Sequence, residues 1–134
     1  MKLSGGCYCG ALRYQSIGEP ILRAQCHCNA CQVFSGGGAN YFILMPRDGF
    51  QYLHGAARQF SHPDVKNART RDFCAACGTH ILTRRPGKDD VVIKVGTLDD
   101  PTLFGTSQMA INTADIRPFH EIRENVPQFD RLPD

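Results

Sequence analysis

The stretch Cys26-His27-Cys28-Asn29-Ala30-Cys31 places three thiols close together in the chain. A two-cysteine cluster lies on either side of it, Cys7-Tyr8-Cys9-Gly10 upstream and Cys74-Ala75-Ala76-Cys77-Gly78 downstream, and the three clusters contain all seven cysteines. Structural zinc sites are usually closed by four ligands, whereas three protein ligands leave one position open to another molecule. Seven thiols are therefore enough for one closed site and one open site.

Length and charge exclude several classes of protein. At 134 residues without a long Ser/Gly/Pro-rich segment, the chain is expected to form one domain, residues 1–134. The 15 Lys and Arg nearly balance the 13 Asp and Glu, so the strong positive charge of a dedicated nucleic-acid binder is missing. No apolar run approaches the roughly 20 residues that span a bilayer, and residues 1–6 do not resemble a secretory signal. We expect a soluble, cytoplasmic protein without a membrane or nucleic-acid partner.

The odd number of cysteines also bears on their chemistry. Clustered cysteines in a reducing compartment are more often metal ligands than disulfides, and seven thiols cannot all pair within one chain. Disulfides remain the alternative, which a secreted context would favour.

Short stretches with the period of a β-strand follow one another along the chain, and none shows helical periodicity over three turns. The run Val91-Val92-Ile93-Lys94-Val95 is the strongest, and with 79–84 it predicts a hairpin turning at Pro86-Gly87. The tail from Ile116 contains three prolines and is expected to be extended along the domain. This pattern predicts an all-β fold. The expected strands are 11–17, 21–25, 40–45, 50–53, 57–61, 69–73, 79–84, 91–95 and, more weakly, 107–112.

The central cluster begins where the strand 21–25 ends. Residues 27–34 are enough for about one helical turn, which would bring Cys28 and Cys31, at i and i+3, onto one side. The run Gly36-Gly37-Gly38 follows, and its glycines permit close backbone approach to a ligand. A flexible connector explains the same glycines equally well.

The spacing of the thiols favours a division into four and three. In Cys-x-x-Cys-Gly, a tight turn sets both sulfurs on one side while backbone N–H groups can donate to them. Three sulfurs close in sequence chelate one ion at little loop-closure cost, so the middle cluster is best kept together. The outer clusters would then share a closed site with sulfurs about 2.3 Å from zinc. That closed site consists of Cys7, Cys9, Cys74 and Cys77.

The alternative for the middle cluster is a second structural site with a fourth ligand. His27 cannot easily point at the ion held by both flanking cysteines, whereas His80 could approach from a neighbouring strand, and an acidic residue could also complete the set. A histidine near zinc is more often an outer donor or a packed residue than a ligand, and we treat both histidines in that way.

The complete motif set resembles one known family. Its parts are Gly6-Cys7-Tyr8-Cys9-Gly10, the central cluster from Cys26 to Cys31, and Arg71-Asp72-Phe73-Cys74-Ala75-Ala76-Cys77-Gly78-Thr79. These motifs, from Gly5 to about Leu82, and the proline-punctuated tail from Phe119 to Pro133 resemble the glutathione-dependent formaldehyde-activating enzyme family, also called the GFA or CENP-V domain.

The resemblance implies several small coiled antiparallel β-sheets around a zinc centre. It implies two zinc ions per chain, a structural one on Cys7, Cys9, Cys74 and Cys77 and an exposed one on Cys26, Cys28 and Cys31. It also implies a carbon–sulfur lyase activity, the condensation of formaldehyde with glutathione to S-hydroxymethylglutathione.

An open zinc position suggests a mechanism. A substrate thiol, glutathione or a similar one, would lose its proton there, and its sulfur would attack a small aldehyde bound nearby. Cys26, Cys28 and Cys31 are therefore the candidate catalytic residues. Candidates to neutralise the surplus negative charge or to grip a substrate carboxylate are Arg23, Arg47, Arg58 and Arg84.

Two other functions fit the same residues. A thiol-binding carrier without a catalytic step would use the same fold, because fold does not fix function. A zinc-stapled interaction module is the other, and the balanced charge argues against its nucleic-acid form.

Overall fold

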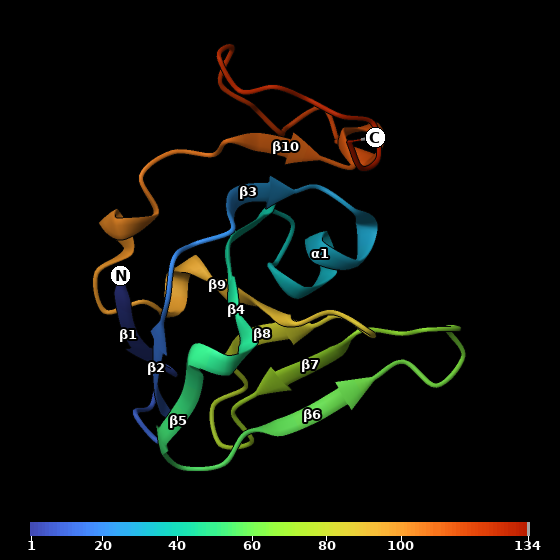
Figure 1. The fold of residues 1–134 in the computed structure, drawn as a ribbon. Helices are drawn as coiled ribbons and strands as arrows, with labels where there is room; N and C mark the ends of the chain where they lie inside the picture. The colour runs from blue at the N-terminus through green and yellow to red at the C-terminus, as the bar shows by residue number, and fades with distance from the viewer. Residues whose placement is uncertain (134) are drawn as a thin grey trace.

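The computed structural model describes residues 1–133. The chain is almost entirely β-structure, arranged in two sheets (Figure 1), which confirms the all-β expectation. The smaller sheet has the strand order β1-β2-β5 and the larger one β10-β3-β4-β9-β8-β7-β6. The strands are β1 (Lys2–Gly6), β2 (Arg13–Ile17), β3 (Leu22–Cys26), β4 (Asn40–Pro46), β5 (Phe50–His54), β6 (Arg58–Ser61), β7 (Thr70–Phe73), β8 (His80–Arg84), β9 (Asp90–Lys94) and β10 (Met109–Ile111).

The central strand β9 explains where the two hydrophobic cores lie. It pairs antiparallel with β4 on one side and with β8 on the other, so the expected 79–84 and 91–95 hairpin is confirmed. Alternate side chains of a strand face opposite sides of the sheet. Val91 and Ile93 accordingly pack in the larger core with Tyr14, while Val92 packs in a smaller core with Cys26.

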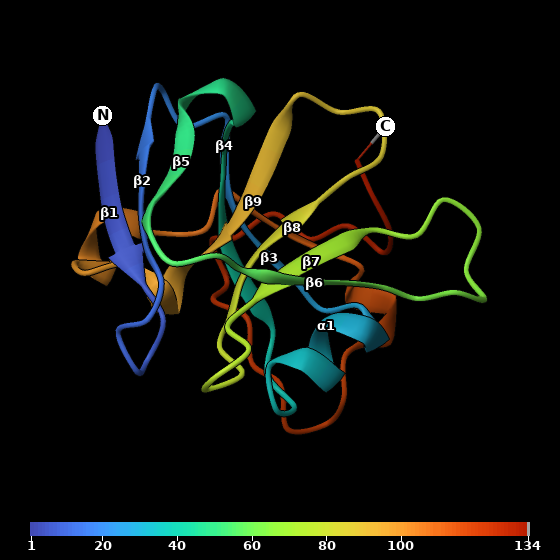
Figure 2. The ribbon, with the colours of Figure 1, turned by 90° about the horizontal axis from the view of Figure 1, so that it is seen from below.

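The one α-helix within residues 1–133, α1 (Asn29–Phe34), begins inside the central cysteine cluster, where the sequence predicted a helical turn. It packs beside β3 and β4, away from the three-stranded sheet (Figures 1 and 2). The half-buried side chains of Cys28 and Cys31 belong to the smaller core. Short 3-10 turns occur at Arg47–Gly49, Val95–Thr97, Pro101–Phe104 and Thr113–Asp115. Within residues 1–133 no helix is long and apolar enough to cross a membrane.

Strand β1 was not expected from the sequence. It pairs antiparallel with β2, although Gly5 and Gly6 are poor strand formers. A Cβ atom on Gly5 would lie 2.2 Å from the carbonyl oxygen of Thr97, and one on Gly6 would lie 2.2 Å from that of Leu12. The glycines are therefore needed because the backbone of neighbouring segments approaches this strand closely.

The last part of the tail, residues 127–129, follows β10 along its outer side, whereas residues 116–126 form a loop with turns, so the extended tail expected from the sequence holds only for its end (Figure 1). The backbone N–H of Ala110 donates to the carbonyl of Pro127 at 2.8 Å, and the N–H of Phe129 donates to the carbonyl of Ala110 at 2.9 Å. His120 Nε2 lies 2.6 Å from the carbonyl oxygen of Gly37, which ties the tail to the glycine run after α1.

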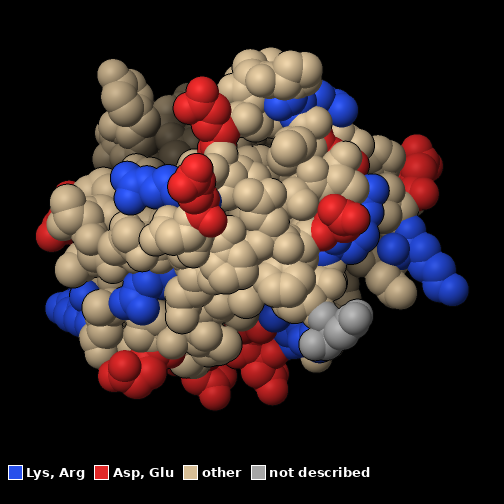
Figure 3. Space-filling model, turned by 90° about the horizontal axis from the view of Figure 1, so that it is seen from above, with Lys and Arg blue, Asp and Glu red and all other residues tan. Residues whose placement is uncertain are grey.

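Charged side chains of both signs are interspersed on the face shown in Figure 3. This distribution matches the near balance of 15 basic and 13 acidic residues in the sequence.

Candidate metal centres

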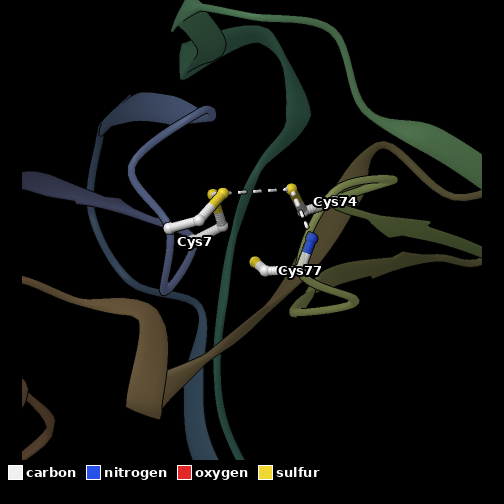
Figure 4. Close-up of side chains that lie close together, drawn as sticks. Cys7, Cys74 and Cys77 are labelled. Atoms are coloured by element: carbon white, nitrogen blue, oxygen red, sulfur yellow. Dashed lines mark hydrogen bonds between the residues drawn. The ribbon is translucent and has the colours of Figure 1, made fainter.

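The outer cysteine clusters meet at one point in the structure. Cys7 and Cys9 lie in the turn between β1 and β2, and Cys74 and Cys77 lie in the turn between β7 and β8. The side chains of Cys7, Cys74 and Cys77 point toward one another (Figure 4). The four sulfurs lie within 4.8 Å of one another, with 3.6 Å between Cys7 and Cys9 and 3.8 Å between Cys9 and Cys74. A tetrahedral site with zinc–sulfur bonds of about 2.3 Å places its sulfurs about 3.8 Å apart. The donor set therefore fits a closed zinc site.

Backbone donors surround this four-cysteine cluster. The N–H of Leu12 donates to Cys7 Sγ at 3.2 Å, and the N–H of Cys77 donates to Cys74 Sγ at 3.4 Å. Such hydrogen bonds stabilise a thiolate over a thiol. All seven cysteines are free of disulfides, so the disulfide alternative is not the state of this structure.

Each of the two turns that hold the four thiols contains a glycine, and a threonine side chain contacts both turns. Gly10 and Gly78 have φ values of 84° and 79°, the left-handed conformation that glycine adopts without strain. The hydroxyl of Thr79 lies 3.1 Å from Cys77 Sγ and accepts a hydrogen bond from the N–H of Tyr8 at 3.1 Å. Thr79 therefore connects the two turns, a role that the sequence reasoning missed.

The three central thiols form a second group, separate from the first. Cys26 ends β3, Cys28 is the N-cap of α1 and Cys31 lies within the helix, and their sulfurs lie within 4.8 Å of one another. The N–H of Cys31 donates to Cys28 Sγ at 3.3 Å. Among residues 1–133, no histidine, aspartate or glutamate joins this group at that distance. The structure thus brings together three donors without a fourth from the described chain.

The three thiols shift one another's pKa values in different directions. Hydrogen bonds from Cys26 and Cys31 hold the pKa of the Cys28 thiol far below its usual range. The contact with Cys28 raises the pKa of Cys26, and the contacts with Cys26 and Cys28 raise that of Cys31. Three clustered thiols suit a soft metal cation, which would displace their protons on binding.

Asn112 supports this group from outside. Its amide Nδ2 donates to Cys26 Sγ at 3.3 Å, and its φ of 56° lies in the left-handed region. Asn112 follows β10 and comes near Cys26 because β10 pairs in parallel with β3. Nothing near Asn112 in the sequence indicated this contact, because it depends on strand pairing between distant segments.

Replacing Asn112 by glycine is expected to weaken metal retention by the three-cysteine group about 10–100-fold, the usual effect of losing an outer hydrogen bond to a ligand. Glycine accepts the same positive φ, so the change isolates the amide. Competition with a chelator measures the effect. Asn67→Gly is the matched control, since Asn67 has a φ of 55° and is exposed. Equal retention by the two variants would contradict the role of Asn112.

The two histidines considered from the sequence have other partners. His27 is buried, with Nε2 2.9 Å from Gln25 Oε1 and its ring 5.5 Å from that of His120. His80 Nε2 lies 3.1 Å from the carbonyl oxygen of Leu82. Neither histidine belongs to the metal-binding groups within residues 1–133.

A cavity of about 340 Å³ adjoins the three-cysteine group. Cys31 and Phe34 of α1 line one side of it, and His80 and Lys94, which lie on β8 and β9, line another. The Arg71 guanidinium lies 4.4 Å from the centre of the Phe34 ring. Lys94 was not predicted as a site residue from the sequence. Its spacing from Val92 could have indicated this position, because residues two apart on a strand lie on one face, and Val92 packs in the smaller core.

The four arginines considered from the sequence are not among the residues that line this cavity. Arg84 pairs with Asp72, and Arg47 pairs with Asp89. Arg23 contacts the sulfur of Met1 at 3.8 Å, and Arg58 is exposed on β6.

Residues 2–115 match the sequence model of the family described as glutathione-dependent formaldehyde-activating enzyme, with both cysteine groups inside the matched range. The chain belongs to the glutathione-dependent formaldehyde-activating enzyme family. A Halomonas elongata protein that bears this enzyme's name provisionally is 27% identical over 97 residues, which are 69% of this chain and 62% of that protein. The chain therefore matches less than two thirds of the length of this relative.

The fold of this family member also has a counterpart among solved structures. A crystal structure of a Rhodobacter sphaeroides protein superimposes with a TM-score of 0.61 at 19% identity, covering 80% of this chain and 97% of that one. At this identity the likeness concerns the fold.

Proposed function

We propose that this chain is a zinc-dependent carbon–sulfur lyase that condenses a thiol, glutathione or a similar one, with formaldehyde or another small aldehyde. The observation that carries the proposal is the three-cysteine group without a fourth ligand from residues 1–133, next to a cavity that shares Cys31 with it. Family membership and the provisional name of the Halomonas elongata relative support the same substrates.

Two zinc ions have suitable donors in this chain. Cys7, Cys9, Cys74 and Cys77 would hold a structural ion, and Cys26, Cys28 and Cys31 would hold a second one. When bound at three thiolates, zinc favours the deprotonated form of an incoming thiol, which is the nucleophilic form. Asn112 and the N–H of Cys31 keep the sulfurs of Cys26 and Cys28 oriented.

The walls of the cavity would position the two substrates. Because Cys31 belongs to both the thiol group and the cavity, a substrate sulfur beside the group has its carbon chain inside the cavity. In the reaction a sulfur–carbon bond forms while the carbonyl π bond breaks, and the electron pair moves to oxygen. The thiol proton passes to solvent, and the oxygen takes up a proton, so the condensation needs no oxidant or reductant.

A second cavity supports a thiol as large as a short peptide. Its volume is about 620 Å³, and it adjoins the first because both are lined by Tyr41, Val95 and Gly96. Ser107 and Arg123 provide a hydroxyl and a positive charge in its wall. A thiol whose sulfur lies near Cys31 thus has room for polar ends on the far side of Tyr41.

The test combines native mass spectrometry with calorimetric titration of glutathione, on the wild type and on Cys28→Ser. We expect two zinc ions in the wild type, one in the variant, and glutathione binding by the wild type alone. Circular dichroism serves as the control for folding, which should be preserved because the four-cysteine group is untouched. Retention of both metals by the folded variant, with no thiol binding in either protein, would overturn the proposal.

Catalysis needs a separate measurement, since binding alone does not distinguish an enzyme from a thiol carrier. The rate of hemithioacetal formation from glutathione and formaldehyde should exceed the uncatalysed rate for the wild type and equal it for Cys28→Ser. Zinc-dependent thiol binding without acceleration would instead assign the chain as a carrier.

A further inference from the structure

Lys94 ends β9 on the face of the large sheet that carries the three-cysteine group. The strand register places Lys94 opposite Phe42, and Phe42 opposite Ala24, two residues before Cys26 on β3. Directly paired residues share one face of a sheet, and so do residues two apart on one strand. Lys94 and Cys26 therefore project from the same face, beneath α1.

The Lys94 ammonium has no acidic partner. The ion pairs formed within residues 1–133 do not include it, although the side chain is half-buried. Burial lowers the pKa of Lys94 to about 8, with the nearby charge of Arg71 acting in the same direction. At neutral pH the side chain is thus mainly a cation, held beside the cavity without a carboxylate to neutralise it.

Arg71, the other cation near this cavity, is not among the residues that line it. Its guanidinium lies over the face of the Phe34 ring at 4.4 Å, a cation–π contact. Among the described residues that line the cavity, Lys94 is the one lysine or arginine.

His80, which lines the same cavity, has a ring nitrogen without a partner among the described residues. Nε2 of His80 donates to the carbonyl oxygen of Leu82 at 3.1 Å, because a carbonyl can only accept. Burial lowers the pKa of His80 to about 4, so the ring is neutral and Nδ1 bears a lone pair. Nδ1 is buried without a hydrogen-bond partner in the described chain, which is uncommon for a polar atom.

We propose that Lys94 is a catalytic residue that donates a hydrogen bond to the carbonyl oxygen of the aldehyde while the substrate sulfur adds to its carbon. This assignment rests on the proposed function and specifies where the aldehyde binds, in the 340 Å³ cavity between α1 and strands β4, β8 and β9. As the sulfur–carbon bond forms, negative charge develops on the oxygen, and a preplaced cation stabilises that charge more than it stabilises the neutral carbonyl. The oxygen then takes its proton from water, and Lys94 stays protonated.

The kinetic test uses Lys94→Met, which keeps the length and volume of the side chain and removes its charge. We expect kcat for glutathione and formaldehyde to fall about 100-fold, the range for loss of one such donor. KM for the thiol and the two bound zinc ions should not change, and Lys94→Arg should recover part of kcat. Lys88→Met is the matched control, because Lys88 is exposed in the turn between β8 and β9. A kcat within twofold of the wild type would overturn the proposal.

A binding test does not depend on turnover. Thioacetate carries an oxygen on the carbon that bears its sulfur, as the adduct does, whereas ethanethiol has no oxygen. Calorimetry should show that Lys94→Met weakens the binding of thioacetate about tenfold more than the binding of ethanethiol. This difference corresponds to one hydrogen bond to a charged group. An equal change for both ligands would show that Lys94 acts only on the sulfur and would overturn its contact with the oxygen.

The two tests separate the two proposals. A wild type that does not accelerate the reaction overturns the proposed function, and the thioacetate comparison still decides whether Lys94 contacts the oxygen. A wild type that accelerates the reaction, with a Lys94→Met variant that retains kcat and the thioacetate preference, overturns the assignment of Lys94 alone.

Discussion

Cys74→Ser is expected to abolish the folded state. Cys74 is buried, and its sulfur lies 3.8 Å from that of Cys9, a residue 65 positions earlier in the chain. Binding at structural zinc sites contributes about 10–16 kcal/mol in small zinc domains, comparable with the whole stability of a typical domain. Loss of one ligand from this group should therefore leave a chain without cooperative thermal unfolding and with poor dispersion of its amide NMR signals.

The matched control for this result is Cys28→Ser, the same substitution in the other thiol group. That variant should lose one zinc ion and keep its cooperative unfolding, because its group is formed by residues close in sequence. A Cys74→Ser protein that unfolds cooperatively near the wild-type temperature would show that the four-cysteine group does not hold the fold together.

The second large effect is expected at Asp72, which is 1% exposed. Its carboxylate accepts hydrogen bonds from Arg84 Nε at 3.1 Å and Nη2 at 2.9 Å, from the Tyr52 hydroxyl at 2.8 Å and from Gln59 Nε2 at 3.0 Å. Asp72→Ala removes the common acceptor and leaves a partly buried guanidinium without its partner. The free energy of unfolding should fall by about 3–5 kcal/mol, as when one partner of a buried ion pair is removed.

Urea unfolding measures this loss, with Asp89→Ala as the control. Asp89 pairs with Arg47 at the surface, where its side chain is 92% exposed, so solvent replaces most of what the pair contributes. The control should unfold at the wild-type urea concentration. Equal midpoints for the two variants would contradict a stabilising role for the Asp72 network.

Most of the fold could be predicted from the sequence because the strands carry local patterns. The alternation in β2 and the branched run in β9 depend on the residues of each strand alone. β1 could not be found in this way, because Gly5 is required by the close approach of Thr97 and not by any preference of its own. The partners of the strands, and the parallel pairing of β10 with β3, also depend on contacts between distant segments.

The division of the thiols into two groups could also be predicted from the sequence. Neighbouring cysteines chelate locally, so the spacing keeps Cys26, Cys28 and Cys31 together, and the meeting of the two outer clusters was inferred from the four thiols that remained. The residues around the cavity could not be predicted from the sequence, because Lys94, His80 and Arg71 come from separate strands of the large sheet. Of the arginines considered from the sequence, Arg47 and Arg84 form ion pairs elsewhere, Arg23 contacts the sulfur of Met1 and Arg58 is exposed, which the residue type alone does not reveal.

The tail that follows β10 also covers one edge of the large sheet. A free edge of a sheet offers unpaired backbone groups to strands of other molecules. At β10 the N–H and carbonyl of Ala110 are occupied by Pro127 and Phe129, so this edge cannot serve as a template. The opposite edge, β6, has only four residues and carries the charge of Arg58, which also discourages pairing. Both edges of the large sheet therefore disfavour pairing with another molecule. The tail covers β10, and β6 is short and carries a charge.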